Sequence, residues 1–538
     1  MYQVALTQSL FPALADTPFR PTTIAAMLRE QARAQGDVPA LRELLGDGAI
    51  GREWTYAELL GDCERLGRAL AARHGRGARI AIFANNLPEW IWMELAAGFA
   101  GLTLVTVNPA FNARELRYVL EQSRAEAVYF VPSVRGNPLG PIVESACADL
   151  PAVRHRILLT DHDALFDGEE EGVLRETVPD DIVQIQYTSG TTGFPKGALL
   201  HQKGLIQNGF DAMHRFGVRT GDPLLIFMPL FHTAGCALLV LGGLATGGTL
   251  LLAPGFDPEM IARVIERERP TYLLGVPTMI VGLIDEAARS GRDLSSIKSV
   301  MSGGAMVAPE LVAAARRAFG APIQIVYGQT ETSPGITVAW SVDNEADLSG
   351  TIGQPLPHMD VAILSTDDRS ICPIGVQGEI CCRGYNVMAG YNDNDEATAA
   401  AICPEGWLHT GDLGTMDARG YLRITGRVKD LIIRGGENVY PAEIENAMLE
   451  HEAILEAAVV GIPDDTWGEL VACFMRARGA ERPAPDSLKA FIRERLSPQK
   501  TPAYWIWVDQ WPLTGSGKIQ KFALREAFVR GDHQPAAG

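Results

Sequence analysis

The sequence predicts an α/β protein. A large N-terminal domain of doubly wound αβ subdomains plus a β-rich subdomain precedes a small α+β C-terminal domain. Three observations support this class. Short apolar runs alternate with helical patterns up to about residue 330, glycines separate short strands beyond residue 350, and the last hundred or so residues mix both element types. Alternating β and α elements are typical of a parallel sheet covered by helices on both faces.

The first predicted strands are short apolar runs at 78–83, 102–107 and 127–131. An apolar helix from Pro88 to Ala100 separates the first two. The same alternation then predicts strands at 182–187, 224–228, 272–275, 297–302 and 323–327, and helices at 203–216, 258–268 and 309–319.

The sequence pattern changes beyond residue 350, where glycine and turn residues alternate with short strands. The runs VAILS, GEICCRG and YLRITGR predict the strands of the β-rich subdomain. The final unit is expected to have a helix from Pro441, a strand near 456–461, a helix near 487–496 and a helix after Lys518.

Charge and cysteine content limit the possible partners. The net charge of −18 disfavours nucleic acid and anionic membrane as partners. The eight cysteines form no C-x-x-C pair and no zinc-finger spacing, so we expect reduced thiols in a cytoplasmic protein. The N-terminus shows no signal-peptide pattern.

Two segments resemble features that we do not expect them to form. Residues 233–256 carry no charge and could span a bilayer, but six glycines favour a buried helix, a glycine turn and a buried strand at 249–253. We therefore expect no integral span, and peripheral membrane contact stays open. GDGAIG at 46–51 matches G-x-G-x-x-G, but the helix-like PALRELL before it makes a hairpin turn the better interpretation.

The strongest chemical signal is YTSGTTGFPKG at 187–197, between the strand DIVQIQ and a helix beginning near His201. Glycine backbone N–H groups, hydroxyls and a lysine in one loop can surround a phosphate, although the spacing is not that of a Walker A loop. The residues that would form this phosphate cradle are Thr188, Ser189, Gly190, Thr191, Thr192, Gly193 and Lys196.

YGQTE at 327–331 follows a predicted strand, so its polar residues lie where open α/β sheets bind ligands. Thr330 can donate to a phosphate oxygen, and Glu331 is a hard ligand suited to Mg²⁺. Tyr327 offers a flat ring on which a base can lie.

Four further segments complete a series of motifs: MSGGA at 301–305, WLHTGD at 407–412, GRVKDLIIRGGENVYPAEIE at 426–445 and PLTGSGKIQK at 512–521. Together and in this order, the motifs resemble those of the AMP-forming acyl-CoA synthetases, members of the adenylate-forming superfamily. The resemblance runs from roughly Phe19 to Arg525, nearly the whole chain. It implies an ATP-dependent carboxylate–CoA ligase. A carboxylate attacks the α-phosphate of Mg·ATP to give acyl-AMP and pyrophosphate, and the thiol of CoA then takes the acyl group and releases AMP.

The resemblance also implies roles for single residues. Thr330 contacts the α-phosphate, Glu331 holds the metal, and Asp412 binds the ribose with Arg427 as a second nucleotide contact. The adenine, or the acyl group, packs against residues with little or no side chain and against one aromatic ring, namely Gly303, Gly304, Ala305, Tyr327 and Gly328.

In the family, the C-terminal domain rotates between the two half-reactions. The resemblance divides this chain into an N-terminal domain at 1–428 and a mobile C-terminal domain at 429–538, with Lys429 as the hinge. Lys518 would bridge the carboxylate and the α-phosphate, and Gly435 and Gly436 would line the pantetheine tunnel. His232 either gates the acyl pocket or packs in the core.

The sequence leaves the acid open among fatty, branched or ring-bearing, and aryl acids. The presumed pocket segments 232–241, 275–280 and 301–307 contain no lysine or arginine, which disfavours a dicarboxylate. Three alternatives to a CoA ligase are an enzyme that loads a carrier protein, a membrane-associated fatty-acid transport protein with ligase chemistry, and a binding-only pseudoenzyme. A homodimer is also left open.

Overall fold

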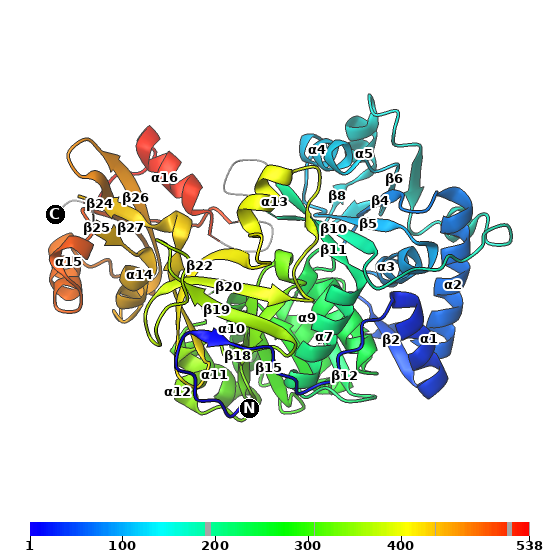
Figure 1. Cartoon of the computed structure of the whole chain (residues 1–538), viewed down its shortest axis with the longest axis horizontal. Coiled ribbons are helices and arrows are strands. Elements are labelled where there is room, and N and C mark those ends of the chain that lie inside the picture. The colour runs from blue at the N-terminus through cyan, green and yellow to red at the C-terminus, as the bar shows by residue number, and fades with distance from the viewer. Residues whose placement is uncertain (189–194, 306, 436, 514–518, 537–538) are drawn as a thin grey trace.

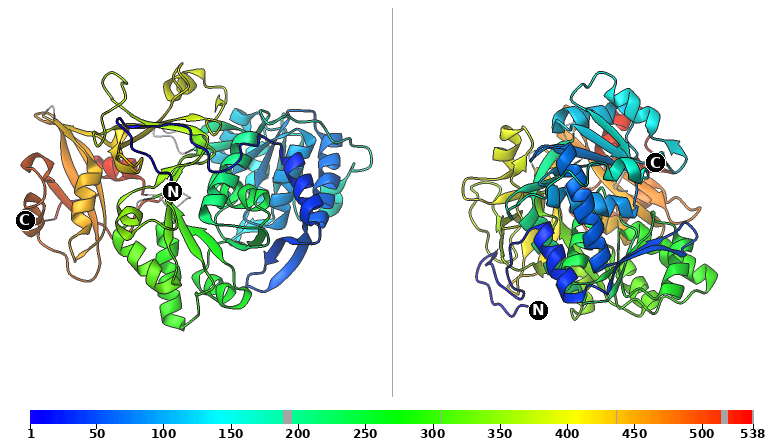
Figure 2. Two further views of the ribbon diagram at one scale, coloured as in Figure 1. Left: turned by 60° about the horizontal axis from the view of Figure 1, so that its bottom comes forward. Right: turned by 90° about the vertical axis from the view of Figure 1, so that its right-hand side faces the viewer.

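The computed structural model describes residues 1–188, 195–305, 307–435, 437–513 and 519–536. Figure 1 shows a large body made by the N-terminal part of the chain and a smaller body at one end, which contains β24 to β27 and α14 to α16. The left view in Figure 2 shows the same separation. The predicted fold class is confirmed: a large mixed α/β N-terminal domain is followed by a smaller C-terminal domain.

The first sheet of the large domain has seven strands. Its central strands are parallel, and the antiparallel strands β11 and β21 close one edge. In spatial order the strands are β21 (Gly390–Tyr391), β11 (Lys196–His201), β10 (Ile182–Thr188), β5 (Thr103–Val107), β4 (Arg79–Phe83), β6 (Ala127–Phe130) and β9 (His155–Leu158). The accompanying helices are α1 (Ile24–Gln35), α2 (Tyr56–Arg73), α3 (Pro88–Ala100), α4 (Ala113–Ser123), α5 (Gly140–Cys147) and α6 (His162–Phe166), with the short strands β7 (Ser133–Val134) and β8 (Asn137–Pro138).

The second sheet has nine strands. In spatial order they are β18 (Gln354–Pro355), β17 (Gly335–Val338), β16 (Ile323–Gly328), β15 (Ser299–Gly303), β14 (Tyr272–Gly275), β12 (Pro223–Ile226), β13 (Thr249–Leu252), β2 (Pro39–Leu44) and β3 (Ile50–Thr55). The helices of this part are α7 (Gln202–Phe216), α8 (Gly242–Ala245), α9 (Pro258–Glu268), α10 (Pro277–Ser290), α11 (Pro309–Phe319) and α12 (Glu345–Gly350). Strands of both sheets share the largest hydrophobic core with α3 and α7.

An antiparallel sheet of five strands forms the β-rich subdomain, as predicted. Its order is β1 (Leu10–Phe11), β19 (Met359–Leu364), β20 (Gly378–Gly384), β22 (Leu408–Met416) and β23 (Leu422–Arg427), and α13 (Asp395–Ala401) lies before β22. The C-terminal domain has its own sheet, with β25 (Glu437–Val439), β24 (Ile432–Arg434), β27 (Gly468–Ala477), β26 (Ile454–Asp464) and β28 (Tyr504–Trp507). Its helices are α14 (Pro441–Leu449), α15 (Pro485–Arg493) and α16 (Lys521–Arg530).

The helix predicted to begin near His201 is confirmed as α7, but residues 196–201 before it form β11, a strand that was not predicted and that pairs antiparallel with β10. One local prediction is wrong. The helix-like run before GDGAIG is strand β2, because its backbone pairs with β13 on one side and β3 on the other. The hairpin turn predicted for GDGAIG is confirmed, since β2 and β3 are antiparallel neighbours.

The uncharged segment 233–256 is largely buried, as expected. It forms a π-helix, η1 (Ala234–Leu241), followed by α8 and β13. A close backbone crossing with α7 explains part of its glycine content: a Cβ atom on Gly242 would lie 2.5 Å from the carbonyl oxygen of Gly209. Within the described residues, no helix has both the length and the apolar character that crossing a bilayer requires.

A buried carboxylate joins three parts of the large domain. Asp211, on α7, is 1% exposed. It accepts hydrogen bonds from the hydroxyl of Thr17 at 2.6 Å, the amide of Gln207 at 2.9 Å and the hydroxyl of Tyr385 at 2.7 Å. Burial raises the pKa of Asp211 to about 6, although these three donors act in the opposite direction.

We predict that Asp211 makes the folded chain less stable as the pH rises. Between about pH 4 and pH 6 the folded state holds a proton that the unfolded state releases, so stability falls through that range. A shift of about two pKa units corresponds to roughly 3 kcal/mol. Asp211→Asn removes this titration, so its melting temperature relative to the wild type should rise from pH 4 to pH 6 and then level off. Asp149→Asn, at an exposed position, is the control, and a constant difference for Asp211→Asn would contradict the prediction.

Candidate active site

The first group of predicted site residues lies where β10 ends and β11 begins. Thr188 and Lys196 are directly opposite one another in this antiparallel pair, and the hydroxyl of Thr188 is 3.4 Å from the carbonyl oxygen of Lys196. The rest of the predicted phosphate cradle, Ser189, Gly190, Thr191, Thr192 and Gly193, lies outside the described residues. The hairpin therefore fixes both flanks of the predicted cradle.

Glu331 lies in the 3₁₀ turn η2 (Thr330–Thr332), just after β16, and is 8% exposed. Its Oε1 atom accepts a hydrogen bond of 2.7 Å from the hydroxyl of Tyr391. Tyr391 is on β21, opposite Ala198 of β11, and the Nζ atom of Lys196 lies 5.1 Å from the centroid of its ring. Tyr391 thus connects the predicted phosphate cradle to the predicted metal ligand.

Sequence reasoning did not find Tyr391. Its only local signal is the glycine turn AGYN, and its contact with Glu331 spans 60 positions of the chain. Burial raises the pKa of Tyr391, so its hydroxyl stays protonated at neutral pH and donates to Glu331.

The second group consists of Tyr327, Asp412 and Arg427, which the structure brings together. The hydroxyl of Tyr327 donates to one oxygen of Asp412 at 2.9 Å, and Nε of Arg427 donates to the other at 2.8 Å. Asp412 and Arg427 face each other on β22 and β23. Asp412 raises the pKa of Arg427, and burial raises that of Tyr327. Each carboxylate oxygen keeps a free lone-pair direction, so Asp412 can still accept from a hydroxyl of a sugar.

The predicted glycines have tight backbone surroundings. Gly303 ends β15, and a Cβ atom there would lie 2.1 Å from the carbonyl oxygen of Val326 on β16. A Cβ atom on Gly328 would lie 1.9 Å from the carbonyl oxygen of Pro334. Gly304 has a φ of 77°, and both it and Ala305 are exposed. Glycine at 303 and 328 is thus required by packing between neighbouring strands, whatever else these positions do.

The remaining predicted residues fall in three places. His232 precedes η1, is partly buried, and accepts a hydrogen bond of 3.3 Å from the backbone N–H of Ala234 on its Nδ1 atom. Lys429 lies in the 3₁₀ turn η3 (Val428–Asp430), between the last strand of the antiparallel sheet and the first strand of the C-terminal sheet. Gly435 turns from β24 to β25 with a φ of 61°. Gly436 and Lys518 are outside the described residues.

The environment of Glu331 fits a magnesium ion that also binds substrate phosphates. In the described chain, Glu331 does not belong to any group of three closely spaced metal-ligating side chains. Mg²⁺ is usually held by one or two carboxylates plus phosphate oxygens, so a single oriented carboxylate is sufficient. The hydrogen bond from Tyr391 to Oε1 orients this carboxylate, and Glu331 is the residue that would hold the ion.

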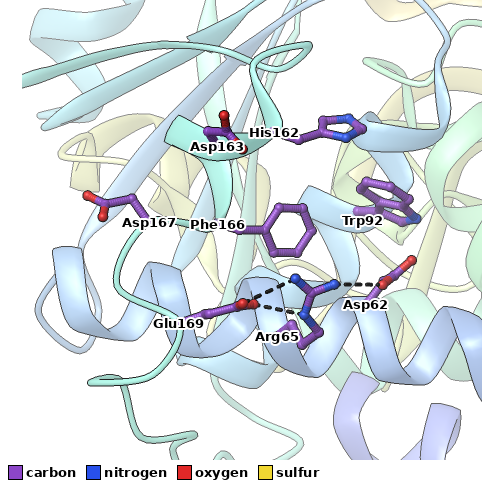
Figure 3. Close-up of a pocket in the computed structure, with 8 residues that line it drawn as sticks. All are labelled: Asp62, Arg65, Trp92, His162, Asp163, Phe166, Asp167 and Glu169. Atoms are coloured by element: carbon purple, nitrogen blue, oxygen red, sulfur yellow. Dashed lines mark hydrogen bonds and ion pairs between the residues drawn. The ribbon is translucent and has the colours of Figure 1, made fainter.

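A separate surface pocket of about 450 Å³ lies among α2, α3 and α6 and contains none of the motif residues. In Figure 3, the guanidinium of Arg65 lies between the carboxylates of Glu169 and Asp62, below the ring of Phe166. Its charge is therefore already paired, and the pocket offers no free cation for a phosphate.

Comparison with known proteins identifies the family to which this chain belongs. The AMP-binding enzyme family matches residues 28–392, and the AMP-binding enzyme C-terminal domain matches residues 443–518. The acyl-CoA synthetase YngI of Bacillus subtilis is 36% identical, covering 94% of this chain and 97% of its own length. The mitochondrial medium-chain acyl-CoA ligase ACSF2 of Danio rerio is 32% identical, covering 97% and 91%.

A solved structure agrees with these sequence relatives. ATP-bound MatB from Rhodopseudomonas palustris superposes with a TM-score of 0.84 at 28% identity, covering 94% of this chain and 99% of its own. The chain therefore belongs to the AMP-binding enzyme family and is an AMP-forming acyl-CoA ligase, which uses ATP and CoA as co-substrates.

Proposed function

We propose that this ligase activates apolar monocarboxylic acids of medium chain length. The observation that carries the proposal is the π-helix η1, whose residues 235–241 are apolar and buried and which begins just after His232. Among the described residues of the presumed pocket segments, 232–241, 275–280, 301–305 and 307, no lysine or arginine could pair with a second carboxylate. The name of the Danio rerio relative, a medium-chain acyl-CoA ligase, supports the same class.

In the first half-reaction, a carboxylate oxygen of the acid bonds to the α-phosphorus of ATP while the bond to pyrophosphate breaks. We assign Thr330 to the α-phosphate and Glu331 to orienting the metal–phosphate group. Asp412, Tyr327 and Arg427 hold the nucleoside. Lys518 neutralises the charge that develops as the carboxylate attacks. Bound Mg²⁺ would neutralise charge on the phosphates of ATP.

In the second half-reaction, the thiol of CoA attacks the acyl carbonyl, and AMP leaves. We place the domain division at 428/429, so that a rotation about Lys429 removes Lys518 and brings Gly435 and Gly436 to the pantetheine. The position of Lys429 between two separate sheets supports this hinge. His232 gates the acyl pocket in this scheme. We also propose a cytoplasmic location, which the eight free, buried cysteines support.

A panel of acids tests the substrate class. Straight-chain acids from acetate to palmitate, each beside the dicarboxylic acid of equal length, are assayed for pyrophosphate release and for CoA thioester. We expect kcat/KM to rise up to about fourfold per buried methylene, to peak at medium length, and to be low for every dicarboxylic acid. Equal turnover of the dicarboxylic acids would contradict the proposed pocket, and pyrophosphate release with no CoA thioester would favour the carrier-protein alternative.

Lys518→Ala tests the catalytic lysine. Pyrophosphate release should fall by about 10²- to 10³-fold, while thioester formation from preformed acyl-AMP should stay near the wild-type rate. Lys489→Ala, an exposed lysine on α15 of the same domain, is the matched control. Equal losses in both half-reactions would remove Lys518 from this role.

Tyr391→Phe tests whether Glu331 is the metal ligand. The substitution keeps the ring but removes the hydrogen bond to Glu331. Outer hydrogen-bond partners of metal ligands are typically worth 10- to 100-fold in affinity, so the Mg²⁺ concentration for half-maximal rate should rise about tenfold or more. Tyr272→Phe removes a comparable bond, to the carbonyl oxygen of Gly217, and should have no such effect. An unchanged Mg²⁺ dependence in Tyr391→Phe would count against the assignment.

Gly303→Ala separates packing from pocket shape. Because the new methyl group would meet the backbone of β16, we expect a loss of about 1–3 kcal/mol of stability and the same fractional loss of activity for all acids. Gly46→Ala, where no atom lies within 4 Å of the new Cβ position, is the control. An unchanged melting temperature together with a KM that grows with acid length would show instead that Gly303 limits the pocket.

A further inference from the structure

Three metal-ligating side chains converge on the antiparallel sheet. Glu379 and Cys381 are two positions apart on β20, and His409 on β22 is the cross-strand partner of Cys381. Their ligand atoms all lie within 4.8 Å of one another. The Nδ1 atom of His409 is 2.8 Å from Oε2 of Glu379 and 3.4 Å from Sγ of Cys381.

A β-bulge creates this convergence. From Glu379 to Cys381, β20 advances two residues, while its partner on β22 changes from Leu413 to His409, four positions away. The extra residues include Gly411, which has a φ of 75°. The backbone N–H of Gly411 donates to Oε1 of Glu379 at 2.9 Å. The bulge thus places an imidazole beside both side chains from β20, as bulges often do when they redirect a side chain.

We propose that Glu379, Cys381 and His409 form a binding site for a divalent transition metal of the zinc class. Thiolate, imidazole and carboxylate are the three ligand types that zinc uses, whereas a thiolate disfavours Mg²⁺. In a tetrahedral zinc site, neighbouring ligand atoms are about 3.4 Å apart. The distance between His409 and Cys381 already matches, and the pair of His409 and Glu379 has to open by only roughly half an ångström.

Two of the three proposed ligands reach solvent, while Cys381 is buried. The side chains of His409 and Glu379 are 13% and 17% exposed, so an ion can enter from solvent, and water can complete the tetrahedron. On binding, the thiol of Cys381 loses its proton to solvent, and Nδ1 of His409 must carry no proton when it bonds to the metal. Binding therefore releases at least one proton and should strengthen as the pH rises.

The competing explanation is that Glu379 and His409 form a structural ion pair beside an unrelated cysteine. In the described part of the chain, Nε2 of His409 is buried without a hydrogen-bond partner. It is unpaired with or without a metal, so it favours neither explanation. The thiol of Cys381 distinguishes the two explanations, because an ion pair between Glu379 and His409 does not require the sulfur, whereas a bound metal would bond to it directly.

Cobalt(II) is the test probe, because its bond to a thiolate gives a charge-transfer absorption band. The tag-free full-length chain is treated with chelator and titrated with Co²⁺ without nucleotide or Mg²⁺. We expect the band to saturate at one Co²⁺ per chain, to disappear when Zn²⁺ is added, and Zn²⁺ to raise the melting temperature. A wild-type chain that gives no thiolate–cobalt band overturns the proposal, whatever the variants do.

Variants locate the site. Cys381→Ser and His409→Gln should lose the band or weaken Co²⁺ binding by at least about 10- to 100-fold, the loss caused by removing even an outer partner of a ligand. Cys382→Ser is the matched control: Cys382 is also buried, but as the next residue on β20 it points to the opposite face. A band that survives in Cys381→Ser, or one lost only in Cys382→Ser, would place the metal elsewhere and overturn the proposal.

Discussion

The carboxylate of Asp412 holds together parts of the chain that otherwise have separate sheets. One oxygen accepts a hydrogen bond from Tyr327, near the end of strand β16 in the nine-stranded sheet. The other accepts a hydrogen bond from Arg427, the last residue of strand β23 in the antiparallel sheet. Arg427 directly precedes the turn that leads to the C-terminal domain. A buried carboxylate is stable only with such partners. The proposed nucleoside site and the entry to the C-terminal domain therefore depend on the same charge.

Local signals in the sequence were sufficient for several of the helices. The helices α3, α9 and α11 have the predicted bounds, because each begins with proline at its first turn and ends at a residue in the left-handed conformation. The grouping of Tyr327, Asp412 and Arg427 also followed from motifs. Those motifs lie on β16, β22 and β23, and the pairing of β22 with β23 sets Asp412 opposite Arg427.

What the sequence did not predict depends on pairing between distant segments. Strand β2 has helix-forming residues, but its pairing with β13 and β3 overrides that preference. Strand β11 was not predicted, because it begins inside a motif whose glycines and lysine indicated only a phosphate-binding loop. The contact of Tyr391 with Glu331 depends on how two sheets are placed against each other. The convergence of Glu379, Cys381 and His409 depends on the register between β20 and β22. No local sequence pattern encodes either arrangement.

The burial of all eight cysteines has a practical consequence for measuring motion in this enzyme. Alkylating dyes need an accessible thiolate, so the folded wild-type chain should react slowly with them. A cysteine introduced on the surface of each domain would then be labelled selectively, without first removing the native ones. The natural chain is thus already a suitable background for attaching a pair of fluorophores that reports the distance between its two domains during turnover.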